Sequence, residues 1–271
     1  MSAAPPPSIR ALERGIEVLR LLGADEGRSL RALHAATGLA KPTLLRILHT
    51  LERGGLVWRS IHDGEWRRAV EWGGGPRPAA DPGLVTVAAP CLVALQRAVL
   101  WPSDLLVYHD FAMEVAESSR RLSGLAMNPR YRIGYRVDLF LSAPGRAWLA
   151  FCDPAQRAAV FEHFRVTPPA NPHSAAVFAG EIGAILDQTR ARGYAVRDPR
   201  FGGSAEDMSR FDDGLDAIAV PVVVAGAACG AINLVWPRRY ELRAKVVDAH
   251  LHDLLGCAAV IAQGLARLRP A

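Results

Sequence analysis

Hydroxyl and guanidinium side chains recur at helical spacing near the start of the chain. From Thr43, such residues follow after three, four and three positions, at Arg46, Thr50 and Arg53, so all of them lie on one face of a helix. The opposite face is an apolar stripe of Leu44, Ile47, Leu48 and Leu51. Because threonine and arginine donate hydrogen bonds to phosphates and to base edges, a helix with these two faces is typical of nucleic-acid recognition.

Two further helices are predicted before this one. The first has an apolar stripe of Leu12, Ile16, Leu19 and Leu22 and stops at Gly23. The second is capped by Ser29 and ends at Gly38. The polar-faced helix begins near Pro42 and ends at Gly54-Gly55. A short helix, a glycine turn and a second helix form the helix-turn-helix pattern, whose second helix enters the major groove.

A hairpin is predicted directly after the helices. Strand residues at 56–59 and 66–68 flank Asp63-Gly64, the residue pair that a tight primed turn requires. Such a wing brings its arginines to phosphates or to the minor groove. The residues expected to contact DNA are Ser29, Lys41, Thr43, Arg46, Thr50, Arg53, Arg59, Arg67 and Arg68.

Catalytic and metal-binding patterns are weak by comparison. His250 and His252 point to different sides of a helix, so they cannot chelate one metal together. Gly203-Ser204 lacks the flanking glycine and the preceding strand of a nucleophile elbow. We therefore predict no enzyme activity, no metal and no cofactor. Two alternatives stay open: a small-molecule hydrolase or lyase with a helical N-terminal appendage, and a ligand-binding module that acts through protein partners alone.

Length and charge fit two domains and a polyanionic partner. The chain has 271 residues, more than the roughly 150 expected of one domain, and Lys and Arg outnumber Asp and Glu by 32 to 27. Residues 1–8 predict a disordered arm and no secretory signal. The uncharged segment 218–236 approaches the length of a membrane span, but Pro221, Gly226 and Gly230 divide it into two strands. Four scattered cysteines are typical of reduced thiols, and we expect a cytoplasmic protein.

The rest of the chain alternates strand and helix patterns. Strands are predicted at 105–110, 114–118 and 132–141, with a hairpin at 217–224 and 229–236. Helices are predicted at 90–100, 144–152, 154–164, 177–192 and 241–268. These elements predict an α+β chain whose larger domain is a central antiparallel sheet with flanking helices.

Several segments together resemble the IclR family of bacterial regulators. They are 9–15 (IRALERG), 37–43 (TGLAKPT), 46–48 (RIL), 142–151 (SAPGRAWLAF), 214–222 (GLDAIAVPV) and 230–234 (GAINL). The resemblance implies a winged helix-turn-helix followed by a GAF-like effector-binding domain. The segments 101–104 (WPSD) and 148–152 (WLAFC) are similar to the branch that activates degradation of hydroxyphenylpropionate and related aromatic acids.

The domain boundaries follow from the pattern and the resemblance together. We expect the arm at 1–8, the winged helix-turn-helix domain at 9–75, a linker and interdomain helix at 76–100 and the effector-binding domain at 101–271. Gly73-Gly74-Gly75-Pro76 and Pro78 depart from the smooth interdomain helix that is usual in the family, which predicts a flexible joint.

The helix start at Ser142-Ala143-Pro144 indicates how an effector is held. The amides of Gly145 and Arg146 are predicted to point out of this helix N-terminus, where they favour a carboxylate. Phe140 and Trp148 are expected as flat walls for an aromatic ring, and Arg132 or Arg136 as a complement to its charge. The resemblance implies effector contacts by Leu139, Gly145, Arg146, Asp207, Leu215, Ala217, Asn233 and Val235.

The expected function is that of a DNA-binding transcriptional regulator that responds to a small aromatic carboxylate and controls an aromatic catabolic operon. Its expected partners are a double-stranded DNA operator, the acid effector, further copies of the chain in a homodimer or homotetramer, and RNA polymerase. The oligomer is expected because one winged domain buries too little surface for specific DNA binding, whereas two-fold symmetry doubles the contacts.

Overall fold

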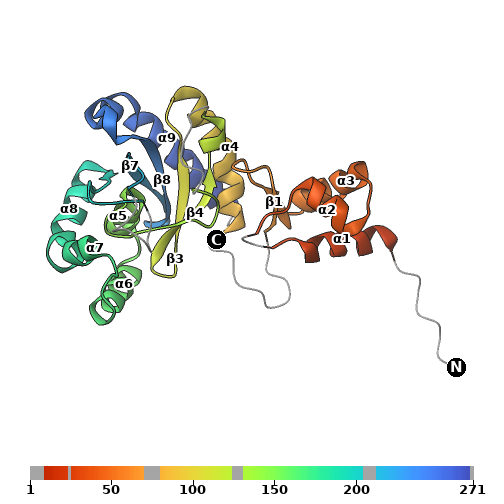
Figure 1. The fold of residues 1–271 in the computed structure, drawn as a ribbon, viewed down its shortest axis with the longest axis horizontal. Coiled ribbons are helices and arrows are strands. Elements are labelled where there is room, and N and C mark those ends of the chain that lie inside the picture. The colour runs from red at the N-terminus through yellow and green to blue at the C-terminus, as the bar shows by residue number, and fades with distance from the viewer. Residues whose placement is uncertain (1–8, 24–25, 70–79, 124–130, 204–211, 269–271) are drawn as a thin grey trace. The chain divides into compact units, whose positions relative to one another are not determined.

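The chain forms two compact units, Met1–Pro82 and Gly83–Ala271. The computed structural model describes residues 9–23, 26–69, 80–123, 131–203 and 212–268 (Figure 1). The predicted arm at 1–8 and the glycines of the predicted joint lie outside the described residues. The helix that we expected to link the domains starts at Pro82 and belongs almost entirely to the second unit.

The first unit is built from three helices around a small apolar core. The helices are α1 (Arg10–Leu21), α2 (Leu30–Thr37) and α3 (Lys41–Arg53). As predicted, Ser29 caps α2 by accepting a hydrogen bond from the Ala32 amide, and Gly38 closes it in the left-handed conformation. The predicted stripe of α1 is wrong at Leu12, which is exposed, because the buried face of α1 begins only at Gly15. The core contains Val18, Leu19, Leu22, Leu33, Leu44, Leu48, Val57 and Trp66.

A two-stranded wing completes this unit. Strands β1 (Val57–Arg59) and β2 (Trp66–Arg68) pair antiparallel. The Ser60 amide donates to the Glu65 carbonyl, and the Gly64 amide donates to the Ser60 carbonyl. The connection is therefore a loop over residues 60–65, which corrects the tight turn expected from Asp63-Gly64.

The second unit contains a six-stranded antiparallel sheet in the order β5-β4-β3-β8-β7-β6. Its strands are β3 (Asp104–His109), β4 (Ala112–Ser118), β5 (Arg136–Val137), β6 (Ala195–Val196), β7 (Leu215–Val224) and β8 (Ala227–Pro237). The hairpin of β7 and β8 confirms the interpretation of the uncharged segment 218–236 as two strands. The strand predicted over 132–141 shortens to β5: a turn in which the Tyr135 amide donates to the Arg132 carbonyl precedes it, and the Asp138 carboxylate ends it by accepting the amides of Phe140 and Leu141.

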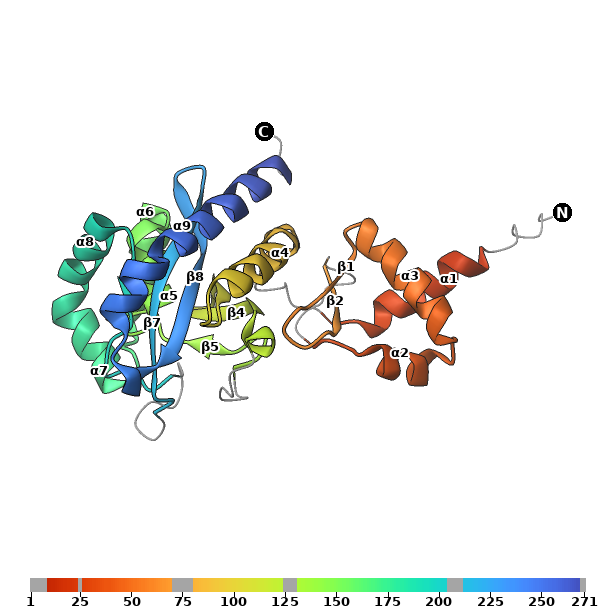
Figure 2. The same ribbon diagram turned by 90° about the horizontal axis from the view of Figure 1, so that it is seen from above.

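Helices cover both faces of this sheet (Figures 1 and 2). They are α4 (Pro82–Ala98), α5 (Ala143–Phe151), α6 (Pro154–Val166), α7 (Pro172–Ala176), α8 (Ile182–Arg192) and α9 (Arg243–Leu268). Short turns of other helix types lie at Arg120–Leu122, Val177–Glu181 and Arg238–Tyr240. Helix α5 packs against β7 and β8 on one face, and α9 packs on the other. Gly264 of α9 lies against Val87 of α4, so α4 shares the face covered by α9.

Helix α9 is also long and apolar enough to span a membrane by length and composition. It packs along β7 and β8, however, and buries Val246, Leu254, Ala258, Ile261 and Leu265. The core helices of globular proteins pass the same composition test, so this helix does not indicate a membrane protein.

Candidate DNA-binding face and effector cavity

The predicted polar face of α3 is largely open to solvent. Lys41, Arg46, Thr50 and Arg53 are exposed, and Thr43 is half-buried. The Thr50 hydroxyl donates to the Arg46 carbonyl at 2.8 Å, so its proton is already used within the helix. The side chains opposite them, Leu44 and Leu48, are fully buried. Amphipathic spacing thus orients the basic face of α3, and its contact with DNA stays a prediction.

The predicted wing and cap residues differ in whether their side chains are exposed and free to contact DNA. Arg59 is exposed, its Nε donates to the Gly64 carbonyl at 2.9 Å, and its guanidinium carbon lies 5.9 Å from the centre of the Trp66 ring. Ser29 uses its hydroxyl oxygen to cap α2. Arg68 is half-buried, and its Nε has no hydrogen-bond partner among the described residues. Of the wing arginines, Arg59 is the one best placed to reach a phosphate.

Arg67 does not fit the DNA-contact prediction. Its side chain is only 4% exposed, and its guanidinium donates to both carboxylate oxygens of Asp63, at 3.0 and 2.6 Å. Burial pushes the pKa of Asp63 upward, but the hydrogen bonds and charge of Arg67 outweigh this and lower it below its usual value. The expectation of a phosphate contact is therefore wrong for this structure: Arg67 fixes the wing loop instead.

Sequence reasoning missed several residues that share the outer side of α3. Leu45 is 46% exposed, and His49 lies one turn beyond it. Together with residues of α3 and the wing they line an open groove, whose lining is Leu45, Arg46, His49, Glu52, Arg59 and Trp66. Their helical spacing could have located them, but an exposed leucine has no hydrogen-bonding chemistry to attract notice.

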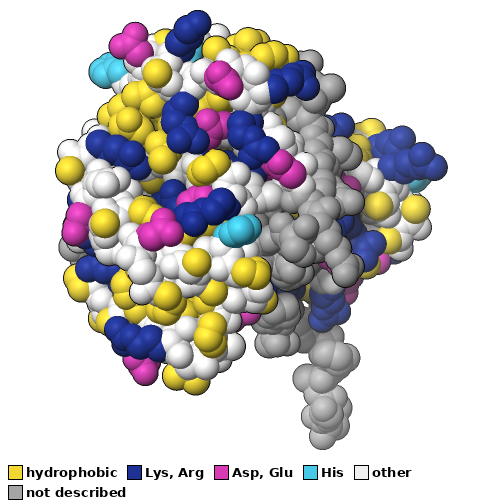
Figure 3. All heavy atoms as spheres, turned by 60° about the vertical axis from the view of Figure 1, so that its left-hand side comes forward, with side chains coloured by type: hydrophobic (Ala, Val, Ile, Leu, Met, Phe, Trp, Pro, Cys, Tyr) yellow, Lys and Arg dark blue, Asp and Glu magenta, His cyan; other side chains and the backbone are white. Residues whose placement is uncertain are grey.

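The second unit presents a different surface. On the face drawn in Figure 3, Lys and Arg side chains are interleaved with Asp and Glu and with apolar side chains. The described residues of this face therefore form no continuous basic surface of the kind that tracks a phosphate backbone. The second unit offers a small cavity instead.

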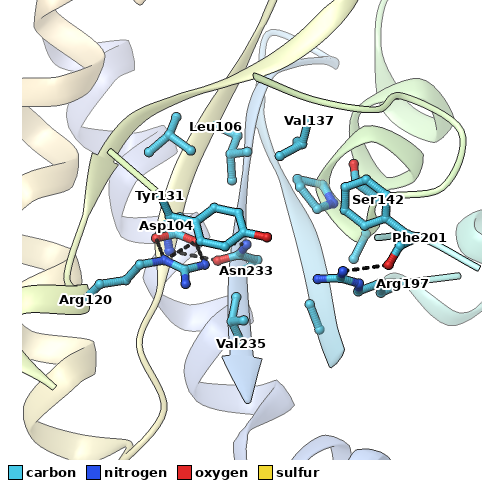
Figure 4. A pocket seen from close by; sticks show the side chains of 14 residues that line it. Asp104, Leu106, Arg120, Tyr131, Val137, Ser142, Arg197, Phe201, Asn233 and Val235 are labelled. Atoms are coloured by element: carbon cyan, nitrogen blue, oxygen red, sulfur yellow. Dashed lines mark hydrogen bonds and ion pairs between the residues drawn. The ribbon is translucent and has the colours of Figure 1, made fainter. Parts of the chain in front are cut away.

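This cavity lies between the sheet and the start of α5 and has a volume of about 30 Å³, room for one or two water molecules. Figure 4 shows Asp104, Arg120 and Asn233 close together on one side and Arg197 and Phe201 on the other. The lining consists of Asp104, Leu106, Val115, Arg120, Tyr131, Val137, Ser142, Ala143, Pro144, Arg197, Phe201, Ala217, Asn233 and Val235. It is polar at both ends and apolar between them.

Two buried ion pairs provide this polarity. Arg120 donates to Asp104 through Nε at 2.9 Å and Nη2 at 2.7 Å. Arg197 donates to Asp213 through Nη2 at 2.6 Å and Nη1 at 3.0 Å. Burial acts to raise the pKa of Asp104, but the adjacent Arg120 charge and hydrogen bonds hold it below its ordinary value. Each pair cancels its own charge, so the polar ends of the cavity are close to neutral.

Tyr131 connects the two ion pairs, and the Phe201 ring packs against the second. The Arg120 guanidinium lies 4.3 Å from the centre of the Tyr131 ring, and the Tyr131 hydroxyl donates to Asp213. Burial and the charge of Asp213 raise the pKa of Tyr131, so this hydroxyl keeps its proton. The Arg197 guanidinium lies 4.4 Å from the Phe201 ring. The Arg197 Nε is buried and has no hydrogen-bond partner among the described residues, which leaves one donor free beside the cavity.

Three predicted effector residues, Ala217, Asn233 and Val235, line this cavity. Asn233 is already engaged: its Oδ1 accepts the Asp104 amide at 2.8 Å, and its Nδ2 donates to the Asp104 carboxylate at 3.3 Å. Asp207 lies outside the described residues. The predicted contacts that are buried in the core but do not line the cavity are Leu139, Phe140, Trp148 and Leu215.

The predicted anion site at the start of α5 is wrong. The Gly145 amide donates to the Ser142 hydroxyl oxygen at 3.0 Å, and the Arg146 amide donates to the Ser142 carbonyl at 3.1 Å. Capping therefore satisfies the amides that were expected to hold a carboxylate. The Arg146 side chain is buried and pairs with Asp198 at 2.7 Å.

Two other predicted charge partners lie away from the cavity. Arg132 is exposed, and Arg136 pairs with Asp110 in the turn between β3 and β4. The arginines that line the cavity instead, Arg120 and Arg197, are each paired with a carboxylate and come from separate segments that only the tertiary fold brings together. The sequence did draw attention to one cavity residue, because Asp104 belongs to the segment 101–104 (WPSD) that resembles the aromatic-acid branch.

Comparisons with known proteins agree with both units. Residues 11–60 match the family model of the IclR helix-turn-helix domain. The glycerol operon regulatory protein of Streptomyces griseus is 27% identical over 254 residues, which cover 85% of each chain. These matches show an IclR-type helix-turn-helix in a chain similar to a regulator over most of its length.

Solved structures show the same fold. The IclR protein of Thermotoga maritima aligns with a TM-score of 0.53 at 16% identity, covering 94% of this chain and 98% of that one. An IclR homologue from Microbacterium hydrocarbonoxydans, solved with 4-hydroxybenzoate, aligns with a TM-score of 0.51 at 22% identity, covering 95% and 99%. The winged helix-turn-helix and the α+β sheet domain are thus confirmed: residues 11–60 form an IclR helix-turn-helix domain, and the chain is similar over most of its length to transcriptional regulators.

Proposed function

We propose that this regulator binds operator DNA through α3 and Arg59 and responds to an aromatic carboxylate taken up at the cavity of the second unit. Control of an aromatic catabolic operon is part of the proposal. For DNA, the support is the exposed basic face of α3. For the effector, the carrying observation is the buried Nε of Arg197, which has no hydrogen-bond partner among the described residues and belongs to a side chain beside the Phe201 ring.

The chemistry of the cavity fits such a ligand. A guanidinium N–H is a strong donor to a carboxylate, and a buried donor without a partner costs about 1–3 kcal/mol. A ligand oxygen at the Arg197 Nε removes this cost. Tyr131 and Phe201 line the cavity and give it aromatic walls, although a guanidinium already lies over one face of each ring. The solved relative that holds 4-hydroxybenzoate supports a ring in this fold.

Cavity size sets the condition for binding. A space of about 30 Å³ does not admit a benzene ring, since even a cavity that binds benzene measures about 150 Å³. Aromatic binding therefore requires the wall to move outward. A short aliphatic keto or hydroxy acid requires less movement, and this observation favours it as the second candidate effector.

DNA binding is tested on the promoter region next to the protein's own gene. We expect a complex whose affinity falls steeply with salt, because each neutralised phosphate releases counterions. Arg46→Ala should weaken operator binding by about 1–3 kcal/mol and relax sequence preference. An Arg46 variant that binds and discriminates like wild type would exclude α3 as the recognition helix.

The same operator complexes can be used to measure the oligomeric state of the protein. We expect light scattering of the protein on a minimal operator to show at least two chains, because a symmetric pair doubles the contacts of one winged domain. A one-to-one complex with full affinity would contradict this arrangement.

Effector binding is tested by calorimetry with 4-hydroxybenzoate, hydroxyphenylpropionate, short keto acids and a neutral aromatic alcohol. Arg197→Lys keeps a cation opposite Asp213 but loses Nε, and we expect it to weaken acid binding. Phe201→Leu should weaken aromatic acids specifically, whereas Phe161→Leu, in the core away from the cavity, serves as the control. Binding of short acids alone would remove the aromatic proposal, and binding of the neutral alcohol alone would remove the carboxylate.

A further inference from the structure

Leu45 is an apolar residue on the outer face of α3, among the polar side chains expected to contact DNA. Its side chain is 46% exposed, although two buried leucines of the same helix, Leu44 and Leu48, show that the core is filled without it. The cost of leaving apolar area in water is about 25 cal/mol per Å², so an exposed leucine gains free energy from any apolar group that covers it. An apolar group on the DNA would have this effect.

The position of Leu45 specifies where such a group must lie. It is the fifth residue of α3, directly before the exposed Arg46, and both residues line the groove between α3 and the wing. Arg59, the exposed arginine of the wing, lines the same groove. The N-terminal half of a recognition helix is the part that contacts base edges, so Leu45 and Arg46 approach neighbouring bases.

We propose that Leu45 contacts the 5-methyl group of a thymine in the major groove, next to the base that Arg46 contacts. This inference rests on the proposed DNA-binding function of α3. Thymine carries the only methyl group among the base edges of the major groove, and apolar side chains recognise it. A leucine offers no hydrogen bond, so it favours thymine over cytosine through this methyl alone. Leu45 thereby adds sequence preference without adding charge.

The test replaces single thymines by deoxyuridine, which removes the methyl group and leaves the base pairing unchanged. Full-length protein first selects its preferred duplex from a random library, and each thymine of one half-site is then replaced in turn. For the wild type we expect one position per half-site at which affinity falls about fourfold, the value for burial of one methyl-sized group. Fluorescence titration measures each affinity.

Variants assign the effect to Leu45. Leu45→Ala should bind the thymine duplex about as weakly as the wild type binds the deoxyuridine duplex. Replacing the thymine by deoxyuridine should not lower the affinity of this variant further. Leu45→Gln, which keeps the length of the side chain, should also lose the discrimination. Leu12→Ala removes a leucine of α1 that is 59% exposed, and we expect it to retain the full fourfold effect.

The outcomes are distinct. If no thymine of the half-site responds to deoxyuridine, or if Leu45→Ala and Leu45→Gln respond like the wild type, the contact is excluded. Equal sensitivity at every thymine in all proteins would assign the effect to DNA shape and would also overturn the proposal. Failure of the wild type to select any duplex would instead contradict the DNA-binding function itself. Thermal unfolding of each variant confirms that the first unit is folded.

Discussion

Asp104→Asn is expected to destabilise the second unit strongly, because it leaves a buried guanidinium without its carboxylate. The side chains of Arg120 and Asp104 are 7% and 3% exposed. Removing one partner of such a pair costs about 3–5 kcal/mol, since the remaining buried charge loses its closest counterion. For a unit of this size about 2–4 °C of melting temperature is lost per kcal/mol, so a fall of about 6–20 °C is expected. The midpoint of urea unfolding should fall in parallel.

Acid should narrow the difference in unfolding free energy between the wild type and the Asp104→Asn variant. Because the pKa of Asp104 in the folded chain lies below its ordinary value of 3.8, the carboxylate stabilises the wild type fully above that value. This stabilisation is lost as the pH falls through the folded pKa. The asparagine variant has no carboxylate at this position, so it has no such stabilisation to lose in acid. The unfolding free energies of the two proteins should therefore begin to converge only below pH 3.8, as the pH approaches the lowered pKa of Asp104 in the folded chain.

A double replacement tests whether the cost of Asp104→Asn comes from the unbalanced charge or from the loss of the side chain itself. Asp104→Leu combined with Arg120→Met removes both charges, and apolar replacement of a whole buried pair is often neutral or stabilising. We expect the double variant to be much more stable than Asp104→Asn. A loss below about 1 kcal/mol for Asp104→Asn, or a double variant as unstable as the sum of its single changes, would refute the interpretation of a desolvated, mutually dependent pair.

Three further predictions concern the wing, α5 and the thiols. Arg59→Ala should reduce the slope of log affinity against log salt by about one, whereas Arg67→Ala should leave that slope unchanged and lower the thermal stability of the first unit. Gly145→Ala should destabilise by about 1–3 kcal/mol or more, because the new Cβ would lie 2.4 Å from a backbone oxygen, while Gly180→Ala, with no atom within 4 Å of its Cβ, is the control. Burial raises the pKa of Cys257 to about 12, so at pH 8 this thiol should react with a disulfide reagent far more slowly in the native protein than in urea.

Local sequence rules were sufficient for most of the helices. Ser29 starts a helix, and Gly38 and Gly193 each end one. These limits were predictable because capping and left-handed closure depend on the residue itself and its immediate neighbours. The β7-β8 hairpin was predictable for the same reason, since Gly226 and the β-branched runs on either side are local features. The strand over 132–141 was not, because the Asp138 carboxylate competes for the strand amides.

The candidate sites depended on interactions that are remote in sequence or decided by geometry. Arg59 and Arg67 look equivalent as wing arginines, but register and Asp63 expose one and bury the other. The cavity brings Arg120, Tyr131 and Arg197 together from well-separated segments. No periodicity marks such a meeting, because it depends on how the sheet and α5 pack.

The charge balance of the cavity determines how an acid could bind there. Both arginines already have carboxylate partners at 2.6–2.9 Å, so a ligand carboxylate meets no surplus of positive charge and lies near two anions. Its attraction must come from the free Arg197 Nε, worth about 1.5–3 kcal/mol for a hydrogen bond to a charged group. Burial of a ring adds a comparable amount, about 1.5–3 kcal/mol. Neither contribution alone offsets the cost of association and of enlarging the cavity. If the proposed function holds, an effector therefore needs both an acceptor for Arg197 and enough apolar surface against Phe201, so a small molecule that carries a ring and a carboxylate fits the proposal better than one with either group alone.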